Sequence, residues 1–172
     1  LEEYMEKIEK IRHSFAHLLA AAVLEKYPEA KPTIGPAIDN GFYYDFDFGG
    51  NIPSEKDLKD IQKGMKKLLN KWDKVEGKEV SAEEAKDIFK DNPYKIEMIN
   101  EMEGDITAYS QGEFLDLCRG PHVQHTGQIK AFKILKVAGA YWRADAKNKQ
   151  LQRLYGISFP DKKELNNYLE LI

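Results

Sequence analysis

The sequence contains a single cysteine, Cys118, among its 172 residues. One cysteine excludes a framework of internal disulfides and favours a reducing compartment such as the cytoplasm. Long apolar runs are also missing, because the longest, Leu18 to Leu24, is far shorter than the roughly 20 residues of a membrane-spanning helix. We therefore expect no membrane partner. The formal net charge of −3 gives no strongly basic field, which argues only weakly against a nucleic-acid partner because such contacts can be local.

The composition that remains is that of a globular protein. Apolar residues make up 42% and charged residues 32% of the chain, and its length suffices for one substantial core. The sequence opens on Leu1 rather than methionine, and both ends have helix-like patterns. We therefore interpret residues 1–172 as a single domain excised from a longer protein.

The fold is expected to be organised around the stretch IRHSFAHLLAAAVLEKY, from Ile11 to Tyr27. Between Phe15 and Leu24 every residue except His17 is apolar or alanine, and a helix with apolar residues all round is buried. His13 and His17 are four residues apart, so their imidazoles project from one side of the helix and can share a metal, a proton or a substrate. Helical spacing places both opposite the core-facing stripe, which predicts that they face an enclosed space.

Periodicity and turn signals predict the other elements. Asn40-Gly41 between two strand-like runs favours a β-hairpin, and Ser81 with Glu84 has the spacing of a helix capping box. Strands are expected over residues 33–38, 42–48, 72–80, 106–110, 113–118, 129–137 and 150–159, and helices over 2–27, from 53, from 81, over 94–102 and from 160. This pattern predicts an α+β fold in which a mostly antiparallel sheet packs against two long helices.

A second group of polar side chains lies in DLCRGPH, residues 116–122. Cys118 and His122 are four residues apart, but Gly120-Pro121 excludes a helix, so this pair must lie at a strand end and turn. Together with the helix pair it supplies three imidazoles and one thiol, a set that suits tetrahedral zinc. Either pair alone is weak evidence, whereas two matched pairs rarely arise by chance. We predict that the two pairs face each other across a small cavity.

Five motifs now carry a resemblance: HSFAH, KPTIGPAIDNGFYYD, DLCRGPHV, AGAYWRAD and LQRLYG. In this order they resemble the editing domain of bacterial-type threonyl-tRNA synthetases, over residues 12–168. The resemblance implies a helix-flanked antiparallel sheet shared with the editing domain of alanyl-tRNA synthetase, and residues from about 115 to 160 are similar to the second additional domain of both enzymes. The implied activity is hydrolysis of seryl-tRNA(Thr), mischarged by the same enzyme. The implied partners are the acceptor end of tRNA(Thr) carrying serine and the rest of a synthetase chain that ligates threonine to tRNA(Thr).

The resemblance also implies roles for individual residues. His13 takes the position of the family's catalytic histidine, which orients or activates a water, and Lys95 that of a lysine near the ester. The catalytic set is completed by His17, Cys118 and His122, and the substrate-binding set consists of Tyr44, as a hydrogen-bond donor, and Asp116, as the ligand of the substrate amine. On the residues alone, Lys95 fits equally well as a solvated helix lysine. Phe15 stands where relatives often have cysteine, and we expect only packing consequences.

Metal use differs between the threonyl and alanyl editing domains that the chain resembles. The alanyl type is associated with zinc on the same constellation, here His13, His17, Cys118 and His122, whereas the threonyl family edits with water and side chains. Because CRGPH resembles the threonyl version, we expect no cofactor in this domain and keep zinc as the alternative. ATP would serve only a ligase core, which we expect downstream of Ile172.

Basic residues near the C-terminal end are candidates for nucleic-acid contacts. We predict that Lys130, Lys133, Lys136 and Arg143 contact phosphates of the tRNA acceptor end, where contacts position the RNA without specifying its sequence. Some of these residues fit equally well as solvated side chains. Two other functions stay open on the sequence alone: a free-standing zinc-dependent editing protein of the alanyl type, and a non-catalytic tRNA-binding accessory domain.

Overall fold

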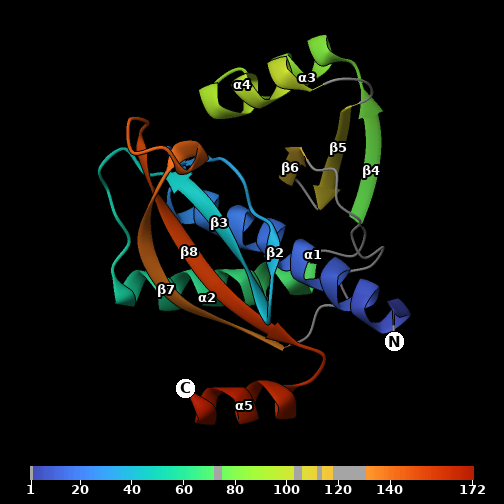
Figure 1. The fold of residues 1–172 in the computed structure, drawn as a ribbon, viewed down its shortest axis with the longest axis vertical. Helices are drawn as coiled ribbons and strands as arrows, with labels where there is room; N and C mark the ends of the chain where they lie inside the picture. The colour runs from blue at the N-terminus through green and yellow to red at the C-terminus, as the bar shows by residue number, and fades with distance from the viewer. Residues whose placement is uncertain (1, 72–74, 103–105, 112–113, 118–130) are drawn as a thin grey trace.

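The computed structural model describes residues 2–71, 75–102, 106–111, 114–117 and 131–172 (Figure 1). In chain order the elements are α1 (Glu2–Lys26), β1 (Lys31–Pro32), β2 (Ala37–Ile38), β3 (Gly41–Asp47), α2 (Glu55–Lys71), β4 (Val75–Val80), α3 (Ala82–Ile88), α4 (Pro93–Glu101), β5 (Ile106–Gln111), β6 (Phe114–Leu117), β7 (Ala131–Tyr141), the short 3-10 helix η2 (Trp142–Ala144), β8 (Gln150–Phe159) and α5 (Lys162–Leu171). The predicted α+β class is confirmed.

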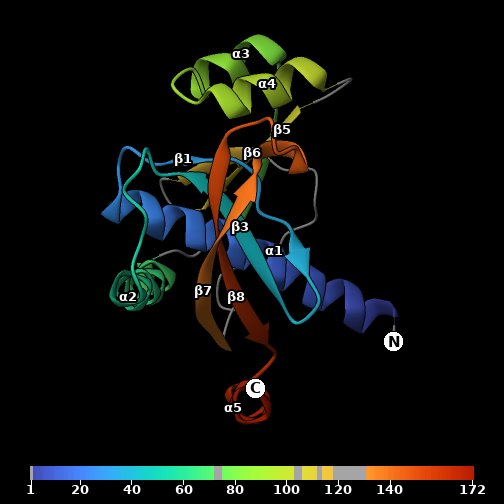
Figure 2. The same ribbon diagram turned by 60° about the vertical axis from the view of Figure 1, so that its left-hand side comes forward.

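The strands form two antiparallel sheets. The main sheet has the order β1-β3-β8-β7, with β2 also paired to β3, and the small sheet has the order β4-β5-β6. α1 and α2 lie side by side and pack against the main sheet, α1 against β3 and α2 against β7 (Figures 1 and 2). α3 and α4 lie at one end of the molecule and α5 at the other. The sequence patterns did not indicate that the strands divide between two sheets.

α1 has the predicted burial. Phe15, Leu18 and Leu19 are fully buried in the main core, together with residues of β3 and α2. His17 is buried and His13 half-buried, away from that core-facing stripe. The helix ends at Lys26, one residue before the expected end, because Pro28 disfavours the helical conformation at the residue before it.

The predicted hairpin forms through Asp39-Asn40. Ile38 pairs with Gly41 across it, and Asn40 adopts φ 62°. Gly41 of the Asn-Gly signal lies in β3 rather than in the turn, so the turn forms one residue earlier than a turn centred on Asn40-Gly41. Of the strand expected over residues 33–38, however, only Ala37–Ile38 (β2) forms, and β1 (Lys31–Pro32) lies before the expected range. Pro36 has no N–H for a ladder, although its carbonyl still accepts a hydrogen bond from the Tyr43 N–H at 3.3 Å. Gly35, which precedes it, lies against the ring of Tyr44.

α2 begins with a capping box. The Ser54 N–H donates to Asp57 Oδ2 at 2.8 Å, and the Asp57 N–H donates to Ser54 Oγ at 3.3 Å. The apolar stripe of α2 is buried and consists of Leu58, Ile61, Met65 and Leu68. This stripe meets α1 as well as β7, so the two long helices share one core.

A side-chain cap fixes the start of α4 and its position against the main sheet. Asn92 caps α4: its side-chain oxygen accepts from the N–H groups of Tyr94 and Lys95. Its Nδ2 also donates to the carbonyl of Pro32 at 2.7 Å, which ties α4 to the main sheet. Ala85, Ile99 and Leu117 form part of a second, smaller core under α3 and α4.

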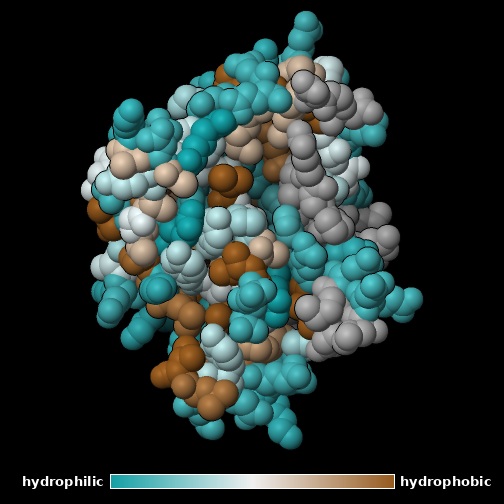
Figure 3. Space-filling view, in the orientation of Figure 1, coloured by the Kyte–Doolittle hydropathy of each residue, from teal (hydrophilic) through white to brown (hydrophobic). Residues whose placement is uncertain are grey.

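The C-terminal elements follow the prediction closely. β8 has the expected bounds, and Asp161 caps α5 by accepting the Glu164 N–H. β7 extends to Tyr141, four residues past the expected end, because its pairing with β8 continues to the η2 turn. Apolar side chains gather over α5 in the space-filling view (Figure 3), where Leu171 and Ile172 are exposed. Within the described ranges no helix combines the length and apolar character that a membrane crossing requires.

Candidate active site

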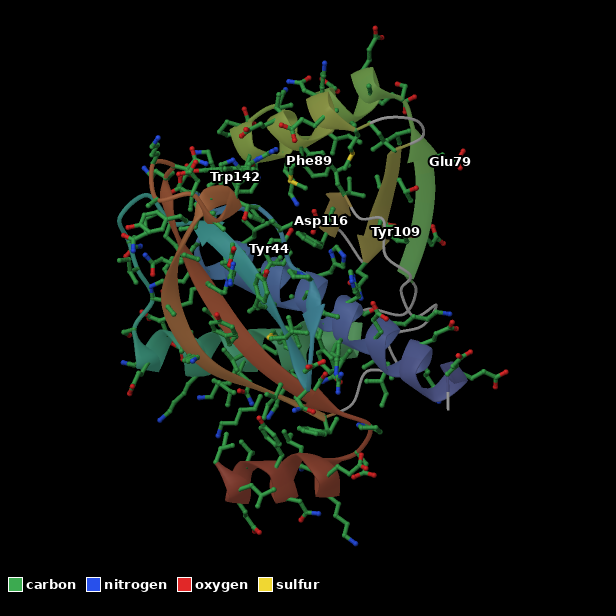
Figure 4. The ribbon with its side chains drawn as sticks, in the orientation of Figure 1. Tyr44, Glu79, Phe89, Tyr109, Asp116 and Trp142 are labelled. Carbon is green, nitrogen blue, oxygen red and sulfur yellow. The ribbon has the colours of Figure 1, made fainter. Side chains whose placement is uncertain are left out.

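A cavity of about 420 Å³ lies where α1 and the main sheet meet α4 and β6. Residues from five separate segments line it: His13, His17, Thr33, Ile34, Gly35, Pro36, Tyr44, Lys95, Met98, Glu101, Met102, Asp116 and Leu117. Five of the predicted catalytic and substrate-binding residues lie within the described ranges. The cavity brings all five together: His13, His17, Tyr44, Lys95 and Asp116. Figure 4 shows Tyr44 on β3 and Asp116 on β6 approaching each other across the gap between the two sheets.

Asp116 is the centre of the polar contacts in this cavity. Its Oδ1 lies 2.6 Å from Lys95 Nζ and accepts the Leu117 N–H at 2.8 Å, while its Oδ2 accepts the Tyr44 hydroxyl at 2.5 Å and lies 2.9 Å from His17 Nδ1. Burial acts to raise the pKa of Asp116, but the charges of Lys95 and His17 and their hydrogen bonds outweigh it and hold that pKa well below its ordinary value. Asp116 is therefore an ionised carboxylate at neutral pH.

Lys95 is almost wholly buried, with 2% of its surface exposed. Its ammonium group donates to the Thr33 carbonyl at 2.7 Å, to the Tyr44 hydroxyl at 3.0 Å and to Asp116 Oδ1 at 2.6 Å. An ammonium carries three N–H donors, so all three are engaged. The interpretation of Lys95 as a solvated helix lysine is thus wrong.

Tyr44 is held rigidly between these groups and the chain behind it. A Cβ atom at Gly35 would lie 2.1 Å from Tyr44 Cδ2, so only glycine lets the backbone approach the ring this closely. On the same face the ring stacks on Phe46 with centroids 5.0 Å apart. Tyr44 is 1% exposed and its hydroxyl belongs to the Asp116 network.

α4 is fixed from its outer side by the turn that joins β7 to β8. The buried Trp142 donates from Nε1 to Glu97 Oε2 at 2.8 Å and packs edge-on against Tyr94. Arg143 Nη2 lies 2.6 Å from Oε2 of Glu101, a residue of the cavity wall, and Arg143 adopts φ 57° there. The AYWRAD motif therefore acts on the position of α4, a role that no reasoning from the sequence assigned to Trp142.

The other predicted site residues lie elsewhere or outside the described part. Lys133 lines a groove beside α2, Lys136 Nζ lies 5.0 Å from the ring centroid of Tyr155, and Arg143 is paired with Glu101 as above. Cys118, His122 and Lys130 fall outside the described residues. Among the residues that are described, no group of three or more His, Cys, Asp and Glu side chains forms a metal-binding cluster, and the four-ligand zinc set stays untested.

Thr33, Met98, Glu101 and Met102 are cavity residues that the sequence did not indicate. Thr33 contributes a backbone carbonyl, for which no side-chain pattern exists. The two methionines lie on the cavity side of α4 and at its end, and methionines at helical spacing are ordinarily core residues.

Comparisons with known proteins agree with the motifs. Residues 106–155 match the family model described as the threonyl and alanyl tRNA synthetase second additional domain. The chain is 53% identical over 169 residues to a threonine–tRNA ligase of Staphylococcus carnosus (strain TM300), and 52% identical over 164 residues to one of Thermotoga neapolitana. These alignments cover 97% and 94% of the chain and 26% of each relative.

The chain matches a segment of the bacterial threonyl-tRNA synthetases. The resemblance that the sequence motifs predicted is thereby confirmed. The chain spans about a quarter of the length of the curated relatives that it matches. Within the matched second additional domain lie β5, β6, β7 and most of β8, which supply Asp116 to the cavity and the turn that holds α4.

Proposed function

We propose that this chain is the editing module of a threonyl-tRNA synthetase and that it hydrolyses the ester of seryl-tRNA(Thr). The observation that carries the proposal is the buried network of His17, Tyr44, Lys95 and Asp116 in the wall of the 420 Å³ cavity. Buried charges are costly and weak evidence for stability, so such a network beside a cavity favours a functional role. The match to threonine–tRNA ligases supports the same conclusion.

A separate editing site has a physical reason. Threonine and serine differ by one methyl group, and one methyl is worth only about 1–3 kcal/mol of discrimination in a binding pocket. A ligase site therefore accepts some serine, and a second site that admits serine but clashes with the extra methyl removes it. We propose that the wall around Tyr44 rejects threonine, because Gly35 on one side and Asp116 on the other leave the ring no room to move.

In the proposed reaction a water attacks the carbonyl carbon of the aminoacyl ester. The bond from that carbon to the ribose oxygen breaks, serine leaves as the free acid, and the ribose oxygen regains a proton. His13 and His17 both line the cavity and are the candidates to take the proton of the water. Asp116 Oδ2 lies 2.9 Å from Nδ1 of His17 and orients that ring. Of the two histidines, we propose His13, one turn earlier on α1, as the base that takes the proton of the water.

The contacts of Lys95 and Asp116 restrict what they can do. Asp116 already receives four contacts, which is about the full capacity of a carboxylate, so a substrate amine must displace one of them. We therefore propose that Asp116 mainly orients Lys95, Tyr44 and His17. Lys95 places a fixed positive charge in the cavity wall, where it stabilises negative charge that develops on the ester or on the leaving ribose oxygen.

We propose that the reaction needs no metal. Lys95 already compensates the charge of Asp116, and a zinc ion bound by the nearby histidines would repel that ammonium. If zinc were used, His13, His17, Cys118 and His122 would be its ligands and it would activate the attacking water. Elemental analysis of protein purified without chelator decides: one tightly held zinc per chain would overturn the metal-free proposal.

The test of the function is hydrolysis of seryl-tRNA(Thr) and threonyl-tRNA(Thr) by this chain and by His13→Ala. The proposal expects rapid release of serine and slow release of threonine by the wild type, and a loss of 100-fold or more in the variant. Binding of tRNA without hydrolysis would instead establish a non-catalytic accessory domain. Full activity of His13→Ala would remove His13 from the mechanism.

For the whole protein we propose ligation of threonine to tRNA(Thr), which is the activity in the name of its relatives. ATP would be a substrate of that ligase part alone. The partners of this chain are then the acceptor end of tRNA(Thr) and the rest of the synthetase, and the compartment is the cytoplasm, in agreement with the single cysteine.

A further inference from the structure

A second cavity, of about 490 Å³, lies at the opposite edge of the main sheet, between α2 and the edge strand β7. Three lysines of α2, Lys59, Lys63 and Lys66, line it together with Lys133 of β7, and Glu55 is the one acidic residue of the lining. We call this the lysine groove. All four lysines are exposed, in a chain whose net charge is −3.

The lysine groove is a consequence of how α2 distributes its charges. Lys59, Lys63 and Lys66 follow one another at spacings of four and three residues, so they share one stripe of the helix. Asp57 and Asp60 lie on another stripe, where Lys26 of α1 approaches them to 3.7 and 3.4 Å. Asp57 and Asp60 are thus paired on the α1 side, and on the groove side Glu55 is the acidic residue that faces the four lysines.

The groove also has a fixed shape. Gln62 Oε1 accepts the N–H of Ile134 at 3.0 Å, which holds α2 against the edge of the sheet where the β7–β8 register shifts. Leu58 and Ile134, both buried, form part of the floor. The lysines therefore project from a rigid frame, three of them from one stripe of α2 and Lys133 from β7.

We infer that the lysine groove binds the phosphate backbone of RNA. This inference rests on the proposed function, since the tRNA substrate supplies the polyanion. Lys59 to Lys66 extend over about 10 Å of helix, which suits consecutive phosphates of one strand better than a single carboxylate. A lysine ammonium is a point charge that contacts phosphates without reading bases.

The position of the groove relative to the first cavity fits one RNA molecule. β1 and β7 are separated by three strand spacings, which is about 15 Å. A strand of about five stacked nucleotides covers a similar distance. A duplex end in the lysine groove can therefore send its single-stranded 3′ end to the cavity that holds Lys95 and Asp116.

The first experiment compares two sets of lysines on the same helix. One variant carries Lys59→Gln, Lys63→Gln and Lys66→Gln, and its matched control carries Lys56→Gln, Lys67→Gln and Lys71→Gln, which change the charge equally outside the groove. Binding of uncharged tRNA(Thr) is measured over a range of salt concentrations. We expect Kd of the groove variant to rise about 10-fold and its slope of log K against log salt to fall by about 2, with less than a 2-fold change in the control.

Equal losses in both variants would overturn the inference, because they would show attraction by net charge alone. Unchanged binding in both would overturn it as well. Glutamine is nearly as good a helix former as lysine, and equal thermal unfolding midpoints of the two variants verify that neither result comes from unfolding.

A second substrate separates this inference from the proposed function. The serine ester of adenosine has the reacting bond but no RNA backbone, so both variants should hydrolyse it at the wild-type rate. Hydrolysis of seryl-tRNA(Thr) below saturation should fall about 10-fold in the groove variant only. If neither ester is hydrolysed by any form, the proposed function fails and the binding result stands alone. If both esters are hydrolysed equally by all forms, the groove inference fails and the function stands.

Discussion

Two buried aspartates of this chain differ in what surrounds them. Asp45 and Asp116 have 3% and 2% of their surface exposed, and each is compensated by a cation. Arg153 meets Asp45 with two parallel contacts, from Nε at 2.7 Å and Nη2 at 2.9 Å, whereas Lys95 meets Asp116 with one. The Arg153 guanidinium is also covered by the Tyr43 ring at 3.9 Å.

The difference arises because β3 carries an ion pair on one face and a residue of the cavity on the other. Tyr44 and Asp45 are neighbours on β3, so their side chains lie on opposite faces. On the outer face the planar Arg153 fork uses up both oxygens of Asp45 in a closed pair. On the inner face Asp116, Tyr44 and Lys95 border a cavity, where a point charge and a phenol can act on a ligand. Burial of an acid is therefore no sign of function unless free space adjoins it.

The largest expected effect comes from removing the cation of the inner pair. Lys95→Met removes the ammonium group that contacts the buried Asp116 at 2.6 Å, and we expect a loss of about 3–5 kcal/mol in the free energy of unfolding. Deacylation of seryl-tRNA(Thr) should fall by about 100- to 1,000-fold. The double variant Lys95→Met with Asp116→Asn should regain stability in urea titrations but no activity. Wild-type deacylation by the single variant would contradict our interpretation of Lys95.

Removing the cation of the outer pair should affect stability alone. Arg153 is partly exposed, so water replaces some of its contact, and Arg153→Met should cost about 1–3 kcal/mol in the free energy of unfolding. Deacylation per folded molecule should stay at the wild-type level. Asp45→Asn in the same chain should restore part of the stability. A rate loss in folded Arg153→Met as large as that of Lys95→Met would abolish the distinction between the two pairs.

A smaller effect is expected from the glycine behind Tyr44. Gly35→Ala adds a methyl where only the ring fits, so the Tyr44 hydroxyl should shift away from Asp116 and kcat should fall about 10-fold. Gly64→Ala is the matched control, because the nearest atom to an added Cβ there is Ala22 Cβ at an ordinary 3.6 Å. That control should keep its activity and gain up to about 1 kcal/mol from helix propensity. Equal kinetics of both variants would show that Tyr44 need not be fixed.

The smallest expected effect is on the free energy of unfolding at acid pH. The folded pKa of Asp116 lies below its unfolded value, so its contribution to stability is complete above about pH 4 and is lost as pH falls further. The free energy of unfolding of the wild type should therefore decrease more steeply between pH 4 and pH 2 than that of Asp116→Asn. Urea titrations at several pH values give both slopes. Parallel slopes would mean that Asp116 is not held ionised by Lys95 and His17.

Sequence reasoning predicted the parts of the site that follow from local patterns. The His13 and His17 pair on a buried helix follows from a spacing of four, and the hairpin follows from the Asn-Gly signal, although its turn lies at Asp39-Asn40. β8 was predicted with its full bounds from alternation and flanking turns. Such features depend on residues a few positions apart, and the motif resemblance placed Tyr44 and Asp116 beside them.

The rest depends on contacts between distant segments. Lys95 is buried because α4 is tied to the Pro32 carbonyl through Asn92 and to the β7–β8 turn through Glu97, and no periodicity of α4 indicates these partners. The division of the strands into two sheets likewise follows from long-range pairing, such as that of β3 with β8. Lys133 lies in a groove only because α2 packs beside it.

The most direct test is the rate of serine release from seryl-tRNA(Thr) in a single turnover by Asp116→Asn and Asp45→Asn, measured side by side on folded protein. If the inner network performs the hydrolysis, Asp116→Asn loses at least 100-fold and Asp45→Asn keeps the wild-type rate. Hydrolysis by Asp116→Asn at the wild-type rate would contradict the assignment of the active site to this cavity.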